Sequence, residues 1–255
     1  MGAQPLRRED GGTKIDPHWE ARCQLAAAFR WTARLNMHEG VANHFSLAVS
    51  DDGARFLMNP NCRHFSRIRA SDLLLLDAHD DSTLDRPDAP DITAWGLHGA
   101  MHRALPQARC VLHAHPKHAT VLASLRDSTI HPIDQNTMRF FERVAVDEDF
   151  GGMAMGEEGA RVCGLMGNKS VLMMGNHGVM VVAPTVAQAF DELYYLERAC
   201  ETLVLAYQTG RELRVAPPEV ARRTCQQWQD YPGLWDGHFQ EIMAILDDEE
   251  PAYRS

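Results

Sequence analysis

Apolar residues in the first third of the chain change from a helical to a strand-like spacing. Over residues 16–37, alanines, leucines and aromatic side chains recur at helical intervals, and Pro17 suits the first turn of a helix. Over residues 40–77 the apolar runs become short and strand-like, as in FSLAV, RFLMN and LLLLD. Residues 78–91 are rich in aspartate and proline, which is typical of an exposed loop. We therefore expect a helix, short strands and a loop in this order.

The middle of the chain continues with short elements of both kinds. The pattern predicts a helix over residues 93–104, a short strand over 110–115 and a helix behind it over 119–125. Residues 152–166 have a helical pattern as well. This mixture of helix and strand favours an α/β fold.

The clearest pattern in the chain is a long helix in its last third. Two short apolar runs, residues 170–174 and 179–182, predict strands on either side of the sequence GNHG. Thr185 and Gln188 then have the spacing of a capping box, and Gly210 stands where a helix C-terminus favours glycine. We expect one helix between these signals and more helix in the tail that follows.

The chain has no feature that divides it into separate domains. Residues 1–14 are polar and contain glycine, so we expect a flexible arm there. No repeat, low-complexity segment or linker interrupts the remainder, and 255 residues with 45% apolar content can bury one substantial core. Residues 15–255 are therefore predicted to form a single α/β domain with a C-terminal helical extension.

Charge and cysteine content exclude several classes of protein. The net charge of −10, without long runs of like charge, argues against nucleic-acid or anionic-membrane partners. The longest apolar runs are too short to span a bilayer, and the polar N-terminus does not resemble a signal peptide. Six widely spaced cysteines without a Cys-x-x-Cys pair indicate reduced thiols. We expect a soluble cytoplasmic protein.

The segment VLHAHPKHATV holds three histidines close together. If residues 110–115 form a strand, His113 and His115 point to the same face, where one metal ion could bind both. Two partly buried histidines bonded to carbonyl groups would fit the same pattern. His118 lies beyond Pro116 and is not expected to share that face.

A catalytic divalent metal usually needs a third protein ligand and an open position. The candidate is His177 in GNHG, where Gly175 and Gly178 would permit a close approach of other groups. A β-turn with a surface histidine is the alternative, so the residues alone leave both interpretations open.

Several segments, in this order, resemble the class II aldolase/adducin family: HEGVANHFSLAVSD, FLMNP, RIRASDLLLLD, HGAMHRALPQARCVLHAHPKHATVLASL and LMMGNHGVMVVAPTVAQAFDELYYLERACE. The resemblance covers about residues 20–230. It implies a three-layer α/β/α fold with a central, mostly antiparallel sheet. It also implies zinc ligands at His113, His115 and His177, and a homo-oligomer, commonly a tetramer with sites between subunits.

The sequence departs from the aldolases of this family at several positions. They carry an acid/base glutamate four residues before the equivalent of His98, where this chain has Ala94. The phosphate-binding elements also differ, and Gln135 stands near the place of a tyrosine contributed across the subunit interface. These departures are closer to the adducin-like branch and argue against cleavage of sugar phosphates.

Three neutral imidazoles leave a bound metal ion positively charged, so it can polarise a carbonyl or a chelating oxo- or hydroxy-acid. This chemistry suits aldol cleavage, decarboxylation or enolisation of a small anionic substrate. Zinc is the first choice of metal, with manganese and iron as alternatives. A non-catalytic adducin-like binding module and an iron-dependent oxygenase are the alternative functions.

Another residue must replace the missing glutamate in proton transfer. The candidates are His44, His64 and His98, because a histidine can titrate near neutral pH. His44 could instead tie two strands together through a structural hydrogen bond. His98 and His102 lie one helical turn apart, and we expect one to be packed and the other exposed.

Substrate binding is assigned to polar residues in the same segments: Asn43, His64, Arg67 and Gln135. His64 lies among three arginines, a composition that favours anions in an otherwise acidic chain. A solvated loop is the alternative for this cluster. Arg139 is a further candidate for an anion contact.

Overall fold

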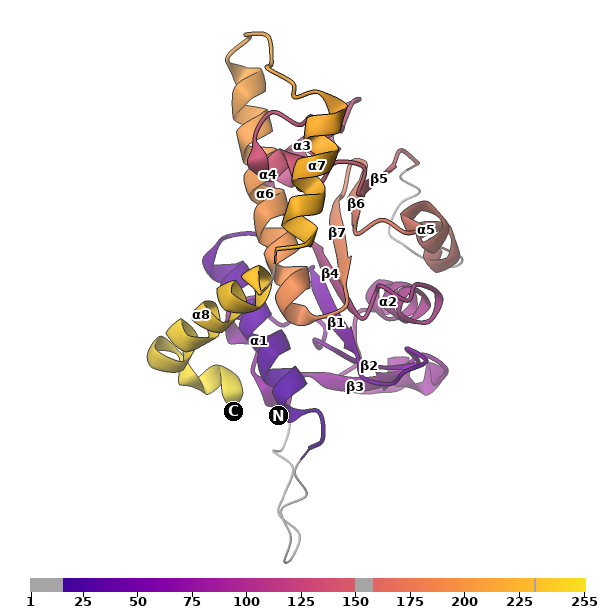
Figure 1. Ribbon diagram of the computed structural model, residues 1–255. Helices are drawn as coiled ribbons and strands as arrows, with labels where there is room; N and C mark the ends of the chain where they lie inside the picture. The colour runs from indigo at the N-terminus through magenta and orange to yellow at the C-terminus, as the bar shows by residue number, and fades with distance from the viewer. Residues whose placement is uncertain (1–15, 150–157, 232) are drawn as a thin grey trace, which may run out of the picture.

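The computed structural model describes residues 16–149, 158–231 and 233–255, and they contain one seven-stranded sheet in the order β3-β2-β1-β4-β7-β6-β5 (Figure 1). Its strands are β1 (His44–Ala48), β2 (Arg55–Met58), β3 (Leu74–Asp77), β4 (Cys110–Ala114), β5 (Val144–Asp147), β6 (Val171–Met174) and β7 (Gly178–Ala183). Every neighbouring pair is antiparallel except β5 and β6. The expected mostly antiparallel sheet is confirmed.

Helices cover both faces of this sheet (Figure 1). The α-helices are α1 (Trp19–Arg34), α2 (Ile92–Ala104), α3 (Lys117–Ala123), α4 (Gln135–Met138), α5 (Glu158–Met166), α6 (Val186–Gln208), α7 (Pro218–Gln229) and α8 (Leu234–Glu249). Short 3-10 helices are η1 (Phe65–Arg67), η2 (Ala70–Asp72), η3 (Asp81–Asp85) and η4 (Pro251–Arg254). Helices α2 and α5 pack on one face, and α1, α3 and α6 pack on the other. The architecture is therefore α/β with three layers.

The central strands are buried on both faces, and successive residues along them belong to different apolar clusters. Leu112 of β4 belongs to the large apolar cluster beneath α1 and α6, whereas Val111 belongs to the cluster beneath α2 and α5. This follows from the two-residue period of a strand, and it explains why β4, β6 and β7 read as continuous apolar runs. By the same period His113 lies on the α2 side.

Most of the predicted elements are present. The long helix begins at the expected place, since the Thr185 hydroxyl accepts a hydrogen bond from the backbone N–H of Gln188 at 3.1 Å, which is one of the two bonds of a capping box. Gly210 has a φ of 65° just beyond the end of the helix. The strand β5, of four residues, was not predicted from the sequence. The predicted arm over residues 1–14 and the first part of the predicted helix over residues 152–166 lie outside the described residues.

Two expectations from composition concern the chain as a whole. No helix in the described ranges is long and apolar enough to cross a membrane. All six cysteines are free, and Cys62 alone among them is exposed.

Candidate metal centre

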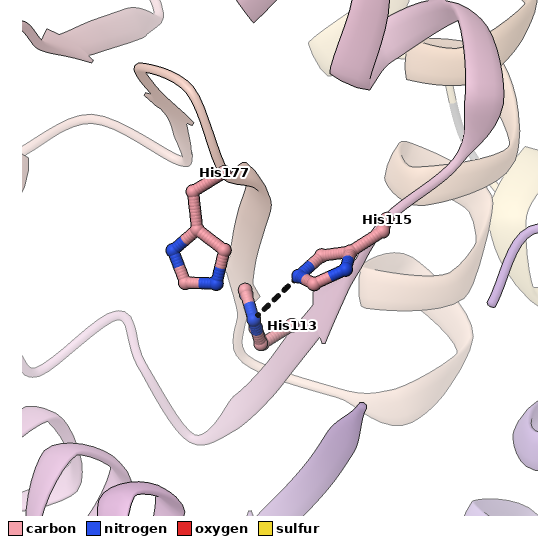
Figure 2. A group of neighbouring side chains, drawn as sticks. All are labelled: His113, His115 and His177. Carbon is pink, nitrogen blue, oxygen red and sulfur yellow. Dashed lines mark hydrogen bonds between the residues drawn. The ribbon is translucent and has the colours of Figure 1, made fainter. Parts of the chain in front are cut away.

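Three histidines meet where β4 ends beside the turn between β6 and β7. His113 is in β4, His115 follows that strand, and His177 comes from the turn (Figure 2). One ring nitrogen of each lies within 4.8 Å of the others. The Nε2 atoms of His113 and His115 are 3.3 Å apart. The structure thus brings together the three residues that the sequence analysis assigned to a metal.

The donor atoms of this group fit a divalent ion. The Nδ1 of His113 lies 3.0 Å from the carbonyl oxygen of Val179, which can only accept, so Nδ1 carries the proton and Nε2 keeps its lone pair. Two nitrogens bound at zinc distances in a tetrahedral site lie about 3.3 Å apart, which matches the spacing of His113 and His115.

Burial keeps the three imidazoles neutral, as metal binding requires. Burial, reinforced by neighbouring histidines, lowers the pKa of His113 well below its usual value and that of His115 to about 4. Burial also lowers the pKa of His177, although the negative charges of Asp147 and Glu158 act in the opposite direction. At neutral pH all three rings therefore offer a lone pair without first losing a proton.

The turn that carries His177 can approach β4 only because glycines flank it. A Cβ atom on Gly178 would lie 2.4 Å from Cδ2 of His115 and 2.8 Å from the carbonyl oxygen of Ala114. A Cβ atom on Gly175 would lie 2.6 Å from the carbonyl oxygen of Asp147. Any side chain at either position would push the turn away from the other ligands.

Two carboxylates beside His177 were not found from the sequence. Asp147 in β5 is 3% exposed and binds Arg161 with both oxygens, at 2.8 and 2.6 Å. The same arginine pairs with Glu158. A four-residue strand gave no signal that Asp147 would be buried near the histidines, because only its pairing with β6 places it there.

Two of the three candidate proton-transfer residues lie beside this group. His44 in β1 pairs directly with His113 in the register of β1 and β4, and the two rings stack with centroids 5.2 Å apart. His98 in α2 meets His44 edge-on with centroids 5.7 Å apart. Burial lowers the pKa of His44 to about 4, against the opposing charge of Asp91 at the start of α2. Asp91 was not a candidate from the sequence.

The expectation that His98 or His102 would be exposed is wrong, since they are 0% and 5% exposed. Ser46 of β1 lies between them, with its hydroxyl oxygen 2.6 Å from Nδ1 of His98 and 2.7 Å from Nε2 of His102. The Ala108 carbonyl oxygen lies 2.6 Å from Nδ1 of His102. His102 thus has a polar partner at each ring nitrogen, and His98 has one at Nδ1.

Asn43 precedes His44 and is 1% exposed. Its side-chain oxygen accepts a hydrogen bond from the Glu39 amide at 2.6 Å. Its Nδ2 is buried and has no hydrogen-bond partner among the described residues. The side chain thus has one anchored end and one donor available next to His44.

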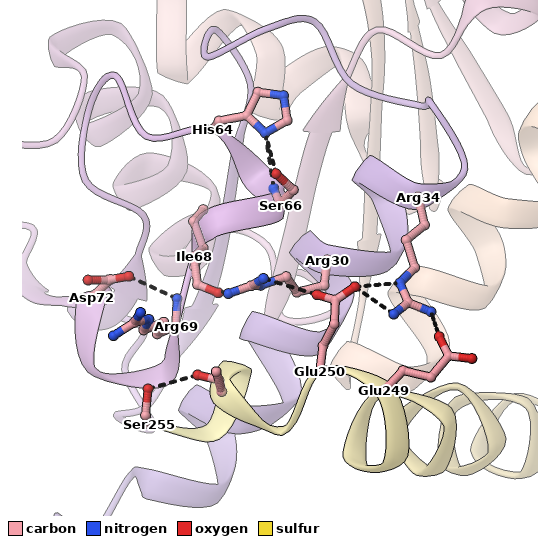
Figure 3. Close-up of polar contacts among 11 residues, drawn as sticks. Arg30, Arg34, His64, Ser66, Ile68, Arg69, Asp72, Glu249, Glu250 and Ser255 are labelled. Atoms are coloured by element: carbon pink, nitrogen blue, oxygen red, sulfur yellow. Dashed lines mark hydrogen bonds and ion pairs between the residues drawn. The ribbon is translucent and has the colours of Figure 1, made fainter.

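His64 and Arg67 lie around η1, in a separate polar cluster. The Nε2 of His64 is 3.1 Å from Nε2 of His38. Its Nδ1 is 2.8 Å from the Ser66 hydroxyl (Figure 3). Arg67 is exposed and forms no ion pair with any described residue. The partners of His64 are outside the three-histidine group, so these contacts do not bring it to the candidate metal.

Gln135 and Arg139 lie at the two ends of α4, which packs on α6 and α7. Gln135 is exposed, and its carbonyl accepts a hydrogen bond from the Trp228 indole at 3.2 Å. Arg139 is 2% exposed; its guanidinium lies 2.6 Å from Asp191 and over the rings of Tyr195 and Trp228. Arg139 is therefore occupied by a buried ion pair.

Comparisons with known proteins agree with this architecture. The model of the Class II Aldolase and Adducin N-terminal domain family matches residues 23–204. A putative aldolase class 2 protein of Caulobacter vibrioides is 29% identical over 95% of both chains. The decarboxylase NovR of Streptomyces niveus is 27% identical over 88% of this chain and 84% of its own. The crystal structure of an aldolase II superfamily protein from Pseudomonas syringae, 29% identical, aligns with a TM-score of 0.84 over 95% of this chain and 98% of that one. The chain therefore belongs to the class II aldolase and adducin family.

Proposed function

We propose that the protein is a metal-dependent enzyme of the lyase type that acts on a small, anionic oxo- or hydroxy-acid or aldehyde. His113, His115 and His177 hold a divalent ion, with zinc as the first choice. The observation that carries the proposal is the convergence of three neutral imidazoles with their lone pairs available. Similarity to proteins described as an aldolase and a decarboxylase supports the reaction class.

A bound metal would supply Lewis-acid polarisation of a substrate carbonyl. The side chains around it would do the rest. His44 accepts or returns the proton, with His98 behind it, and the unpaired Nδ2 of Asn43 donates a hydrogen bond to a substrate oxygen. Arg67, His64 and Gln135 would bind an anionic part of the substrate that extends away from the three-histidine group, because the contacts of His64 and Gln135 lie outside it.

The surroundings of Ala94 support the assignment of proton transfer to a histidine. Ala94 is 1% exposed and packs in an apolar cluster with Phe56, Met58, Leu74 and Leu76. Neither its side chain nor these neighbours can exchange a proton. Aldol cleavage, decarboxylation or enolisation would then depend on His44.

The metal content of the purified protein tests the proposal. Protein made without a histidine tag should carry about one divalent ion per chain, measured by mass spectrometry of the metals. His113→Ala should lose the ion, whereas His79→Ala, which removes an exposed histidine, should keep it. Metal-free wild-type protein, with unchanged stability in His113→Ala, would reject the proposal.

Ala94 also supports a second candidate function, an adducin-like binding module without catalysis. In that case oxo-acids would bind but would not turn over in the metal-loaded protein. Iron in place of zinc, with oxygen consumed during turnover, would instead indicate an oxygenase. We also propose a cytoplasmic homo-oligomer, a tetramer by family resemblance, which light scattering of the purified protein would test.

A further inference from the structure

A row of buried polar groups leads from the three-histidine group to the backbone on the far side of α2. In order, it consists of His44, His98, Ser46, His102 and the carbonyl of Ala108, and we call it the histidine chain. His44 and Ser46 share one face of β1 because a strand has a two-residue period, and His98 and His102 share one face of α2 because they are one turn apart. The two-residue period of β1 and the one-turn spacing in α2 therefore bring these side chains together in one row.

The hydrogen bonds of the histidine chain have a single direction, set by its last member. A carbonyl oxygen can only accept, so the contact of 2.6 Å requires the proton of His102 to be on Nδ1. Burial lowers the pKa of His102 to about 4, so the ring is neutral and its Nε2 has no proton. Nε2 of His102 must then accept its bond of 2.7 Å from the Ser46 hydroxyl.

The same reasoning fixes the proton of His98. A serine hydroxyl has one proton, and Ser46 has given it to His102. The contact of 2.6 Å between Ser46 and Nδ1 of His98 therefore needs the proton on that nitrogen. Nε2 of His98 is left as a bare acceptor, buried, with no hydrogen-bond partner among the described residues. The histidine chain therefore ends at the lone pair on Nε2 of His98.

His44 is a ring that lies beside His98. Its Nδ1 is also buried and also lacks a hydrogen-bond partner in the described part of the chain. The two rings meet edge-on with centroids 5.7 Å apart. A buried polar atom without a partner is unfavourable, and a proton on Nδ1 of His44 would satisfy both atoms through one bridging water molecule.

We propose that the histidine chain fixes His44 as the tautomer with its proton on Nδ1, which leaves the lone pair on Nε2 for the substrate. The role of Nε2 toward the substrate rests on the proposed function, whereas the position of the proton on Nδ1 does not. His98, Ser46 and His102 are positioning residues, since they act through His44. The histidine chain stores no proton, because the Ala108 carbonyl cannot take one. Its effect is to exclude the tautomer of His44 in which Nε2 carries the proton and cannot act as a base.

The tautomers can be read directly by NMR. Long-range ¹H–¹⁵N correlation on metal-free protein with ¹⁵N-labelled histidine distinguishes a proton on Nδ1 from one on Nε2. We expect Nδ1 to be protonated in His44, His98 and His102. Ser46→Ala should release His98 and His44 from this state, while His102 should keep it because its bond to Ala108 remains.

Two further variants separate this effect from a general loss of structure. Ser46→Thr keeps a hydroxyl and should keep all three tautomers. Ser124→Ala removes a hydroxyl that bonds within α3 and should change none of them. The proposal is overturned if wild-type His44 has its proton on Nε2, or if Ser46→Ala leaves the tautomer of His44 unchanged. Because no metal or substrate is present, the result is independent of the proposed enzymatic function.

Discussion

Acid should destabilise the metal-free protein well above the pH at which its carboxylates titrate. Burial lowers the pKa of both His44 and His102 from 6.5 to about 4. The folded state therefore binds fewer protons than the unfolded state between these values. Stability is complete above pH 6.5 and is lost as the pH falls towards the folded pKa.

The size of this effect follows from the two pKa values of each ring. Between pH 7 and pH 5, linkage gives a loss of roughly 2 kcal/mol per histidine, or roughly 4 kcal/mol for His44 and His102 together. Burial also lowers the pKa of His98 and His113, which adds to the loss. The lowered pKa of Asp147 matters only at more acidic pH, so this window isolates the histidines.

Urea unfolding of chelator-treated protein at pH 7 and pH 5 measures the loss. His102→Gln removes one titrating ring and should reduce the pH-dependent part by roughly 2 kcal/mol. His79→Ala, at an exposed position, should leave it unchanged. A free energy of unfolding that changes by less than about 1 kcal/mol between the two pH values would refute the assignment of neutral buried histidines.

Three substitutions test other parts of the molecule. Gly178→Ala should lower zinc affinity roughly tenfold or more in competition with a chelating dye, because its Cβ would lie 2.4 Å from Cδ2 of His115. Asp191→Ala should lower the free energy of unfolding in urea by roughly 3–5 kcal/mol, because it leaves the charge of Arg139 buried without its partner. Ala94→Glu should cost roughly 3 kcal/mol in the same assay and produce no sugar-phosphate cleavage, because the carboxylate would enter an apolar cluster.

Each of these substitutions has a matched control. Gly164→Ala places its Cβ in open space and should not change zinc affinity. Glu201→Ala breaks an exposed pair with Arg198 and should cost less than about 1 kcal/mol. Gly96→Glu adds the same side chain to an exposed position of α2 and should be tolerated. Equal effects within any pair would contradict the corresponding argument.

The patterns of apolar residues were sufficient to predict most of the fold. Helical spacing identified α1, α2 and α6, and short apolar runs identified six of the strands, including β2, β3 and β6 with four residues each. Residues 144–147 were not identified as a strand, since that strand exists through its parallel pairing with β6. Local sequence cannot report a parallel partner that lies farther along the chain.

The candidate site divides in a similar way. The two-residue strand period placed His113 and His115 together, and family resemblance added His177. Which of the remaining histidines would be buried depended on contacts between distant elements. His102 is packed because Ser46 and the Ala108 carbonyl meet its two nitrogens, and neither is adjacent to it in the sequence.

The burial of β4 on both faces has a consequence for the specificity of folding. Apolar residues on both sides of a strand do little to distinguish the native register from a slip by one residue. Such a slip would move His113 from the side of α2 to the large cluster beneath α1 and α6, where its neighbours would be apolar. A slip of β1 by one residue would likewise move the buried Ser46 to the other face of the sheet. These buried polar side chains therefore help the centre of the sheet to fold in one alignment only.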